Sequence, residues 1–139
     1  MTLKDLEQFR YLRKEIVQLA RRLDRLAEKA DVGVFDTVKG SSHDKRNMER
    51  VFIIMGMGGA HRAAYAEVER LLKTRAKRLA EMMAAIDEFI DTIDRSDIRQ
   101  IIDCRYLQGM TWAATSKQVY KYAHKDTARK ALGRFFAKK

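Results

Sequence analysis

The chain of 139 residues carries a formal net charge of +10 and is 46% apolar. This length fits one domain, or one small domain with an extension, and the apolar content predicts a hydrophobic core instead of a disordered chain. It has no run of about 18 uncharged apolar residues, no apolar leader at its amino terminus, and one cysteine, Cys104. From these features we expect a cytoplasmic protein without a membrane-spanning helix, a secretory leader or an internal disulfide.

The first predicted element is a long helix over residues 2–30. Thr2 and Asp5 have the spacing of a capping box, in which two side chains satisfy free amides at a helix start. Behind them, apolar residues recur at alternating steps of three and four, the heptad pattern of a helix that packs along another helix. The members of this seam are Phe9, Leu12, Ile16, Leu19, Leu23, Leu26 and Ala30. A helix of this length needs a packing partner, because propensity alone does not stabilise it.

The segment of residues 31–59 follows and contains five of the seven glycines. Two β-prone runs, at residues 32–38 and 51–55, predict a small two-stranded β-hairpin docked on the helices. The glycine run at residues 56–59 precedes a helix, as in phosphate-binding loops, but it lacks the Gly-Lys-Ser/Thr ending and the surrounding strand–helix–strand pattern. A flexible joint before the next helix is the better interpretation of this run.

A second apolar seam predicts another long helix over residues 60–93, interrupted by Arg75. Its members are Tyr65, Val68, Leu72, Leu79, Met82, Ile86, Phe89 and Ile93. The two long helices form either a hairpin within one chain or a coiled coil between two chains, and the periodicity is compatible with both. Residues 1–93 are therefore predicted to be either an oligomerisation region or an ordinary helical core.

Residues 94–139 are predicted to form a separate domain of three helices. The first helix ends at Gly109, because glycine is the usual residue at a helix stop. Thr111 then caps a short helix that begins with Trp112, and a connector leads to a last helix over residues 125–138. Apolar residues line one face of the first and last helices: Ile98, Ile101, Ile102 and Tyr106 in one, and Ala128, Ala131, Leu132, Phe135 and Phe136 in the other.

The positive charge gathers at this end of the chain. Residues 110–139 contain eight Lys and Arg residues and a single acid, Asp126. Such an end is typical of a surface that binds a polyanion, although a solvated tail has the same composition. A last helix that buries aromatic side chains and exposes cations fits the second helix of a helix-turn-helix, which enters a DNA groove. The alternative is the corner of a helical bundle with a solvated basic face.

Most candidate DNA contacts follow from the chemistry of these side chains. Arg129 and Lys130 are suited to the acceptors of guanine, and Thr127 is suited to a thymine methyl group. Neutralisation of phosphates is assigned to four further cations: Lys117, Lys121, Arg134 and Lys138.

The carboxy-terminal sequence also resembles a known family. Its order of residues is Asp94, Arg99, Ile101, Ile102, Arg105, Tyr106, Gly109, Thr111 and Trp112, followed by a basic helix that ends in Arg134, Phe135 and Phe136. This order resembles the ArpU/RinA-type phage late transcription regulators, whose carboxy-terminal part is similar to the last DNA-binding domain of bacterial sigma factors. The upstream layout is similar too, with a long charged helix, the sequence DTVKGSS, an apolar run before glycines and a second long helix.

The resemblance implies a phage or prophage activator of late or packaging genes. Its partners would be double-stranded DNA and the RNA polymerase of the bacterial host, and the chain would act as a homo-oligomer, with a dimer favoured. Carried over to matching positions, it implies base contacts by Lys125, Thr127, Arg129 and Lys130. It also implies that the motif core is formed by Ile102, Tyr106 and Trp112.

The chain departs from the family pattern at three places. Thr115 and Ser116 stand where the family has an Ile-Ala pair, and the turn near Tyr120 and Lys121 lacks the expected glycine. Gly133 lies inside the last helix, where glycine costs about 1 kcal/mol relative to alanine.

Two other functions remain open at this level. A small terminase subunit would use the same helix-turn-helix to recognise viral DNA for packaging, and its long helices would form a ring. A helical protein-interaction adaptor would bind a partner helix with its apolar seams. No enzyme, cofactor or metal site is predicted, because the three histidines and Cys104 lack metal-ligand spacing and the residues assemble no catalytic triad.

Overall fold

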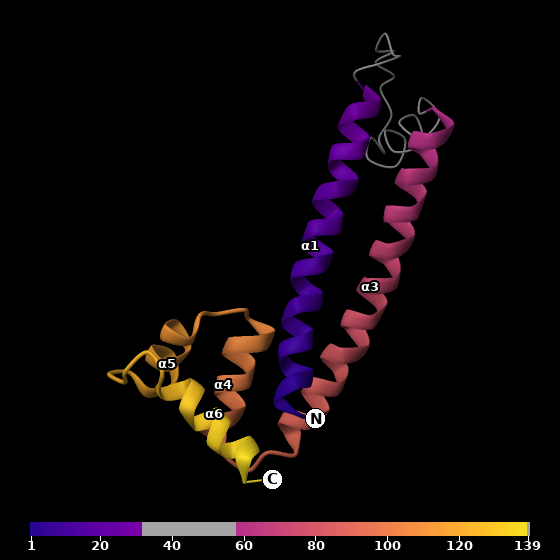
Figure 1. Cartoon of the computed structure of the whole chain (residues 1–139). Helices are drawn as coiled ribbons and strands as arrows, with labels where there is room; N and C mark the ends of the chain where they lie inside the picture. Colours follow the sequence, from indigo (N-terminus) through magenta and orange to yellow (C-terminus); the bar gives the residue numbers. More distant parts are fainter. Residues whose placement is uncertain (32–57, 139) are drawn as a thin grey trace, which may run out of the picture. The chain divides into compact units, whose positions relative to one another are not determined.

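The computed structural model describes residues 1–31 and 58–138 (Figure 1). Over these residues the chain is mainly helical and no strand is present, which confirms the mainly α fold class. The predicted β-hairpin lies outside the described residues. In chain order the elements are α1 (Leu3–Asp31), α3 (Gly59–Asp91), α4 (Ser96–Ile102), the π-helical turn η1 (Asp103–Leu107), α5 (Trp112–Tyr120) and α6 (Thr127–Ala137).

The helix α1 begins at the predicted capping box. Thr2 N and Thr2 Oγ1 donate to Asp5 Oδ2 at 2.7 and 2.8 Å, and Asp5 N donates to Thr2 Oγ1 at 3.3 Å. The bond from the Thr2 hydroxyl is the main reason why the pKa of Asp5 is lowered. The capping box is therefore confirmed.

The chain divides into two compact units, one formed by Met1–Lys14 with Lys77–Lys139 and the other by Glu15–Ala76. In the Glu15–Ala76 unit, the second half of α1 and the first half of α3 lie side by side (Figure 1). Their directions are opposite, because His61 Nε2 is 2.7 Å from Leu26 O at one end and Arg75 Nε donates to Glu15 Oε1 at 2.8 Å at the other.

Burial in this unit is uneven. Tyr65 and Val68 of α3 are buried. The α1 seam residues in the same unit are only half-buried: Ile16, Leu19, Leu23 and Leu26. Part of the apolar stripe of α1 therefore remains accessible in a single chain.

The other unit contains the hydrophobic core of the carboxy-terminal helices. α4 packs against α5 and α6, and α5 packs against α6. Leu6 and Phe9 from the start of α1, and Ile86 from the end of α3, belong to the same core. The three carboxy-terminal helices thus share their core with residues from the 1–93 region. The apolar side chains of this core with no exposure are Leu6, Ile98, Ile101, Ile102, Tyr106, Ala128 and Leu132.

A glycine stop ends the helical run of α4 and η1, as predicted. Gly109 adopts a φ of 77°, which is strained for residues with a side chain. Gln108 N donates to Asp103 O, and Met110 N donates to Cys104 O, both at 2.9 Å. The chain therefore turns sharply after η1 and is directed into α5.

Candidate nucleic-acid interface

The short helix α5 begins at the predicted cap, because Thr111 Oγ1 accepts a hydrogen bond from Ala114 N at 3.2 Å. Near its middle, the fully buried Ser116 contacts the chain that leads into α6. Ser116 Oγ donates to Lys125 O and accepts from Ala128 N, each at 3.0 Å. One hydroxyl group therefore joins α5 to both the end of the connecting turn and the first turn of α6.

The helix α6 has one buried side. Ala128 and Leu132 are fully buried, and Phe135 and Phe136 are half-buried. The Phe136 ring stacks on that of Phe89 at a centroid distance of 6.0 Å. Because the aromatic end of α6 is packed in this way, the opposite side of the helix is left to solvent, as the sequence pattern predicts.

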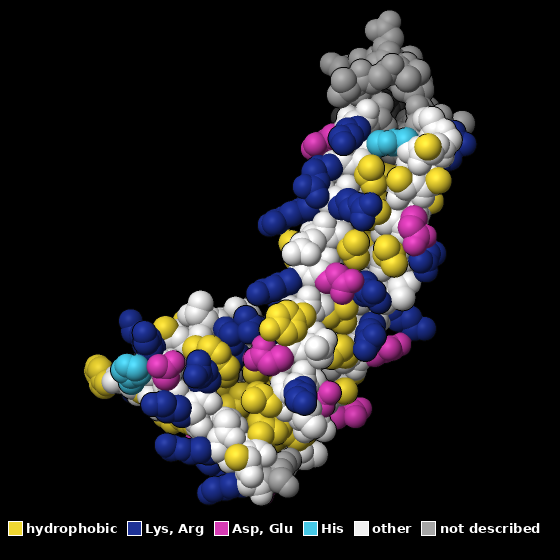
Figure 2. Space-filling view, in the orientation of Figure 1, with side chains coloured by type: hydrophobic (Ala, Val, Ile, Leu, Met, Phe, Trp, Pro, Cys, Tyr) yellow, Lys and Arg dark blue, Asp and Glu magenta, His cyan; other side chains and the backbone are white. Residues whose placement is uncertain are grey.

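All seven cationic candidates are exposed, and Thr127 is half-buried in the first turn of α6. Within the described part of the chain, none of the seven forms an ion pair or a side-chain hydrogen bond. Figure 2 shows Lys and Arg side chains over the part of the molecule that α5 and α6 form. The seven are Lys117, Lys121, Lys125, Arg129, Lys130, Arg134 and Lys138. Their charge is therefore available to an external anion.

Arg129 and Lys130, which were both predicted to contact guanine bases, lie on different sides of α6. At about 100° per residue, Lys130 and Arg134 lie near the middle of the exposed side of α6, while Arg129 lies about 100° from Lys130. Arg129 borders a hollow of about 480 Å³, which is also lined by Leu3, Glu7, Arg10, Trp112, Leu132 and Gly133. Arg129 is thus at the flank of the cationic face, and Lys130 is at its centre.

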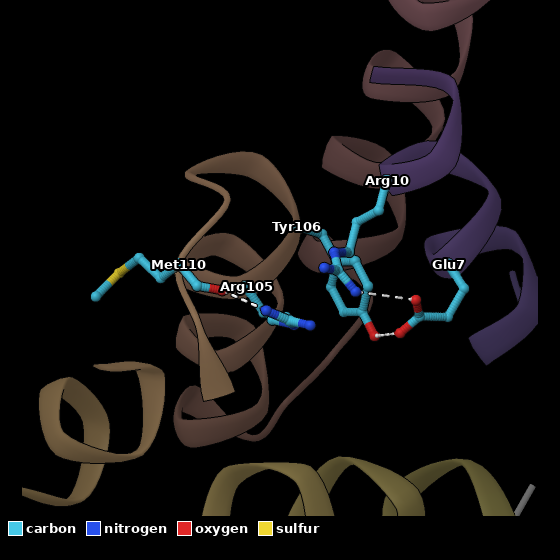
Figure 3. A network of polar contacts seen from close by, with 5 residues as sticks. All are labelled: Glu7, Arg10, Arg105, Tyr106 and Met110. Carbon is cyan, nitrogen blue, oxygen red and sulfur yellow. Dashed lines mark hydrogen bonds and ion pairs between the residues drawn. The ribbon is translucent and has the colours of Figure 1, made fainter. Parts of the chain in front are cut away.

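A network of polar contacts links residues of α1, η1 and the segment before α5 (Figure 3). The Tyr106 hydroxyl donates to Glu7 Oε1 at 3.0 Å, and Arg10 Nη1 contacts Glu7 Oε2 at 3.2 Å. Burial raises the pKa of Tyr106, and the negative charge of Glu7 adds to the effect. The network joins the start of α1 to η1, and no sequence pattern indicated it, because Glu7 and Tyr106 are far apart in the chain.

Arg105 is buried in this network, with 8% of its surface exposed. Its guanidinium carbon lies 4.6 Å from the centroid of the Trp112 ring, and its Nη1 donates to Met110 O at 2.6 Å. Burial lowers the pKa of Arg105, and the positive charge of Arg10 adds to this. The stacked guanidinium holds Trp112 at the start of α5, so Arg105 is a structural residue here and not part of the exposed cationic surface.

Two further contacts fix the helices that support the surface. Arg13 Nη1 donates to Tyr106 O at 2.9 Å and to Leu107 O at 2.8 Å, which satisfies carbonyls at the end of η1. At the end of α5, the Tyr120 hydroxyl donates to Asp97 Oδ2 at 2.8 Å. Burial, followed by this bond, raises the pKa of Tyr120 to about 12. A bond from Arg95 is the main cause that lowers the pKa of Asp97.

Cys104 is buried, and burial raises its pKa. Among the described helices, none is long and apolar enough to cross a membrane. Comparisons of the chain with protein-family models, with curated proteins and with solved structures found no match.

Proposed function

We propose that the chain is a DNA-binding transcriptional regulator of a phage or prophage, of the ArpU/RinA type, in which α5 and α6 form the helix-turn-helix. The proposal depends chiefly on one observation, the exposed side of α6. Lys130 and Arg134 lie there without partners among the described residues, while the other side of the helix is packed in the core. A rigid helix with unpaired cations on its free side is suited to a DNA groove, where phosphates and guanine acceptors supply the opposite charge.

The positions of the remaining candidates support two kinds of contact. Thr127 lies in the first turn of α6, the part of a recognition helix that meets base edges. Lys117 on α5 and the two lysines of the connecting turn, Lys121 and Lys125, are placed to neutralise phosphates beside the groove. Arg129 borders the hollow next to α1, so we assign it to contact with the DNA sugar-phosphate backbone at the edge of the groove. We assign base contact to Lys130.

The departures from the family pattern have a physical reading under this proposal. Ser116 keeps the side chain small where α5 approaches α6, and its hydroxyl adds the bonds to Lys125 O and Ala128 N. Lys121 adopts a φ of 55°, a conformation that favours glycine, at the turn where the family has one. The geometry of the turn is thus obtained with a cation in place of the glycine.

The long helices would provide the oligomer. The half-buried residues of the α1 seam leave apolar surface for a second copy of the chain, and we propose a homodimer in the cytoplasm of the bacterial host. Two copies would present two α6 helices to two half-sites of one operator. The RNA polymerase of the host is the further partner that a late-gene activator would need.

Sequence preference is the property that tests this function. A preferred duplex is first selected with the wild-type protein from a random library, and affinities for that duplex and a shuffled one are then compared by fluorescence anisotropy. Lys130→Glu is expected to lower the ratio of the two affinities, because base contact is lost together with charge.

Arg78→Glu is the matched control, since Arg78 is an exposed cation of α3 and the change in net charge is the same. It should keep the wild-type ratio. If Lys130→Glu also keeps that ratio, α6 does not read bases at this position and the assignment of the recognition helix is wrong.

A further inference from the structure

The turn between α5 and α6 exposes an aromatic ring completely. Tyr122 has 100% of its surface exposed, whereas the other exposed large apolar side chains of the described residues have between 39% and 59%. It follows Lys121, the described non-glycine residue with a positive φ, 55°. A tyrosine normally covers part of its ring with neighbouring atoms, because apolar surface in water is unfavourable.

The exposure is a consequence of the fold of the turn. After the ring, the Ser116 hydroxyl donates to Lys125 O at 3.0 Å. Thr127 N also donates to His124 O at 2.9 Å, and Asp126 N donates to His124 Nδ1 at 3.3 Å. Before the ring, α5 ends at Tyr120, whose hydroxyl donates to Asp97 Oδ2 at 2.8 Å. The ring therefore extends from a short turn that is anchored at both ends.

The exposed charges close to this ring in the sequence are mainly positive. Lys117 at the end of α5, and Lys121 and Lys125 in the turn, are exposed and have no ion pair with a described residue. The single acid of this region, Asp126, lies 3.7 Å from His124 Nδ1. A polyanion is therefore favoured over an uncharged apolar partner. A partner that covers the end of α5 and the turn would desolvate exposed lysines, and an anion compensates their charge.

We propose that Tyr122 is a nucleic-acid contact that packs its ring against a deoxyribose and the adjoining base at the edge of a groove, beside the phosphates that Lys121 and Lys125 neutralise. This inference rests on the proposed function and adds a contact outside α6. Every base and sugar has an apolar face, so such a ring contributes to affinity at any sequence. The turn leads directly into the first turn of α6, which under the proposed function lies at the groove.

The test measures duplex affinity by anisotropy over a series of salt concentrations for wild type, Tyr122→Ala and Tyr122→Phe. Tyr122→Ala is expected to weaken binding about fivefold or more at every salt concentration. The slope of log K against log salt should stay unchanged, because the ring neutralises no phosphate. Tyr122→Phe should bind as wild type, since it keeps the ring. Tyr11→Ala, which removes another exposed tyrosine from α1, should also bind as wild type.

The outcomes separate this inference from the function on which it rests. Wild-type affinity in Tyr122→Ala overturns the contact but leaves the regulator proposal intact. Equal losses in the Ala and Phe variants overturn packing of the ring, because the hydroxyl would then be the contact. Failure of the wild-type protein to bind duplex at low salt overturns both. Folding is not a confounding factor, since removal of a fully exposed side chain leaves the core unchanged, and thermal unfolding checks this for each variant.

Discussion

At the scale of single residues, the hydroxyl of the fully buried Ser116 connects α5, the turn and α6 through two hydrogen bonds. In Ser116→Ala, the buried amide of Ala128 and the carbonyl of Lys125 would lose their partner. We expect the free energy of unfolding to fall by about 1–3 kcal/mol, the usual cost of an unsatisfied buried polar group. Urea denaturation followed by circular dichroism measures it.

The control for this substitution is Ser96→Ala. Ser96 is exposed, and its Oγ accepts a bond from the exposed side chain of Gln100 at 3.3 Å. We expect a change within about 0.5 kcal/mol there. Equal free energies of unfolding for Ser116→Ala and wild type would show that the hydroxyl does not stabilise the connection between α5 and α6.

At the scale of elements, two glycines have opposite roles in their helices. Gly109 ends the run of α4 and η1 with a φ of 77°, and a Cβ there would be 3.6 Å from Arg13 Nη1, an ordinary contact. Gly133 lies in the interior of α6, and a Cβ there would have no atom within 4 Å. Backbone conformation, and not crowding, therefore decides the effect of alanine at both positions.

We expect Gly109→Ala to lower the free energy of unfolding by about 1–2 kcal/mol, because a left-handed conformation is strained with a side chain. Gly133→Ala should raise it by about 0.5–1 kcal/mol, because glycine is unfavourable inside a helix. Thermal unfolding of the two variants and wild type gives both signs in one experiment. A stabilised Gly109→Ala variant would contradict the glycine stop.

The helix caps and the helix stop could be predicted from the sequence, but the contacts between the helices could not. The Thr2 cap, the Thr111 cap and the Gly109 stop depend on neighbouring residues, so their spacing is sufficient to find them. The bonds from Glu7 to Tyr106 and from Arg13 to the end of η1 join residues distant in the chain. No periodicity encodes such a pairing.

At the candidate DNA-binding surface, too, features set within one helix were predictable and features set by contacts between helices were not. An amphipathic pattern predicted which side of α6 would be free, and the exposed Lys130 and Arg134 agree with it. The position of Arg129 beside the hollow depends on the start of α1, which the pattern of α6 does not contain. Arginine is usually a surface residue, so the sequence does not indicate that Arg105 is buried. Its burial follows from its stacking on Trp112, which is a tertiary contact.

At the scale of the whole molecule, the proposed regulator and the terminase alternative share a DNA-binding surface and differ in assembly. Sedimentation velocity of the full chain is expected to give a mass twice the 16.2 kDa of one chain. Dimerisation would cover the accessible part of the α1 seam. A ring of many subunits would favour a packaging role, and a monomer at high concentration would contradict the dimer.

Salt dependence of duplex binding is the decisive test of the claim that the free side of α6 neutralises DNA phosphates and meets a groove. Binding of a duplex is measured by anisotropy for wild type and for the double variant Lys130→Ala with Arg134→Ala. We predict a slope of log K against log salt that is smaller by about 0.9, because Arg134 neutralises a phosphate whereas Lys130 contacts a base. Affinity should also fall at every salt concentration, because the base contact of Lys130 is lost. The control, Lys77→Ala with Arg78→Ala, removes two exposed cations of α3 and should retain the wild-type slope. An equal slope and affinity in wild type and the α6 variant would contradict the claim.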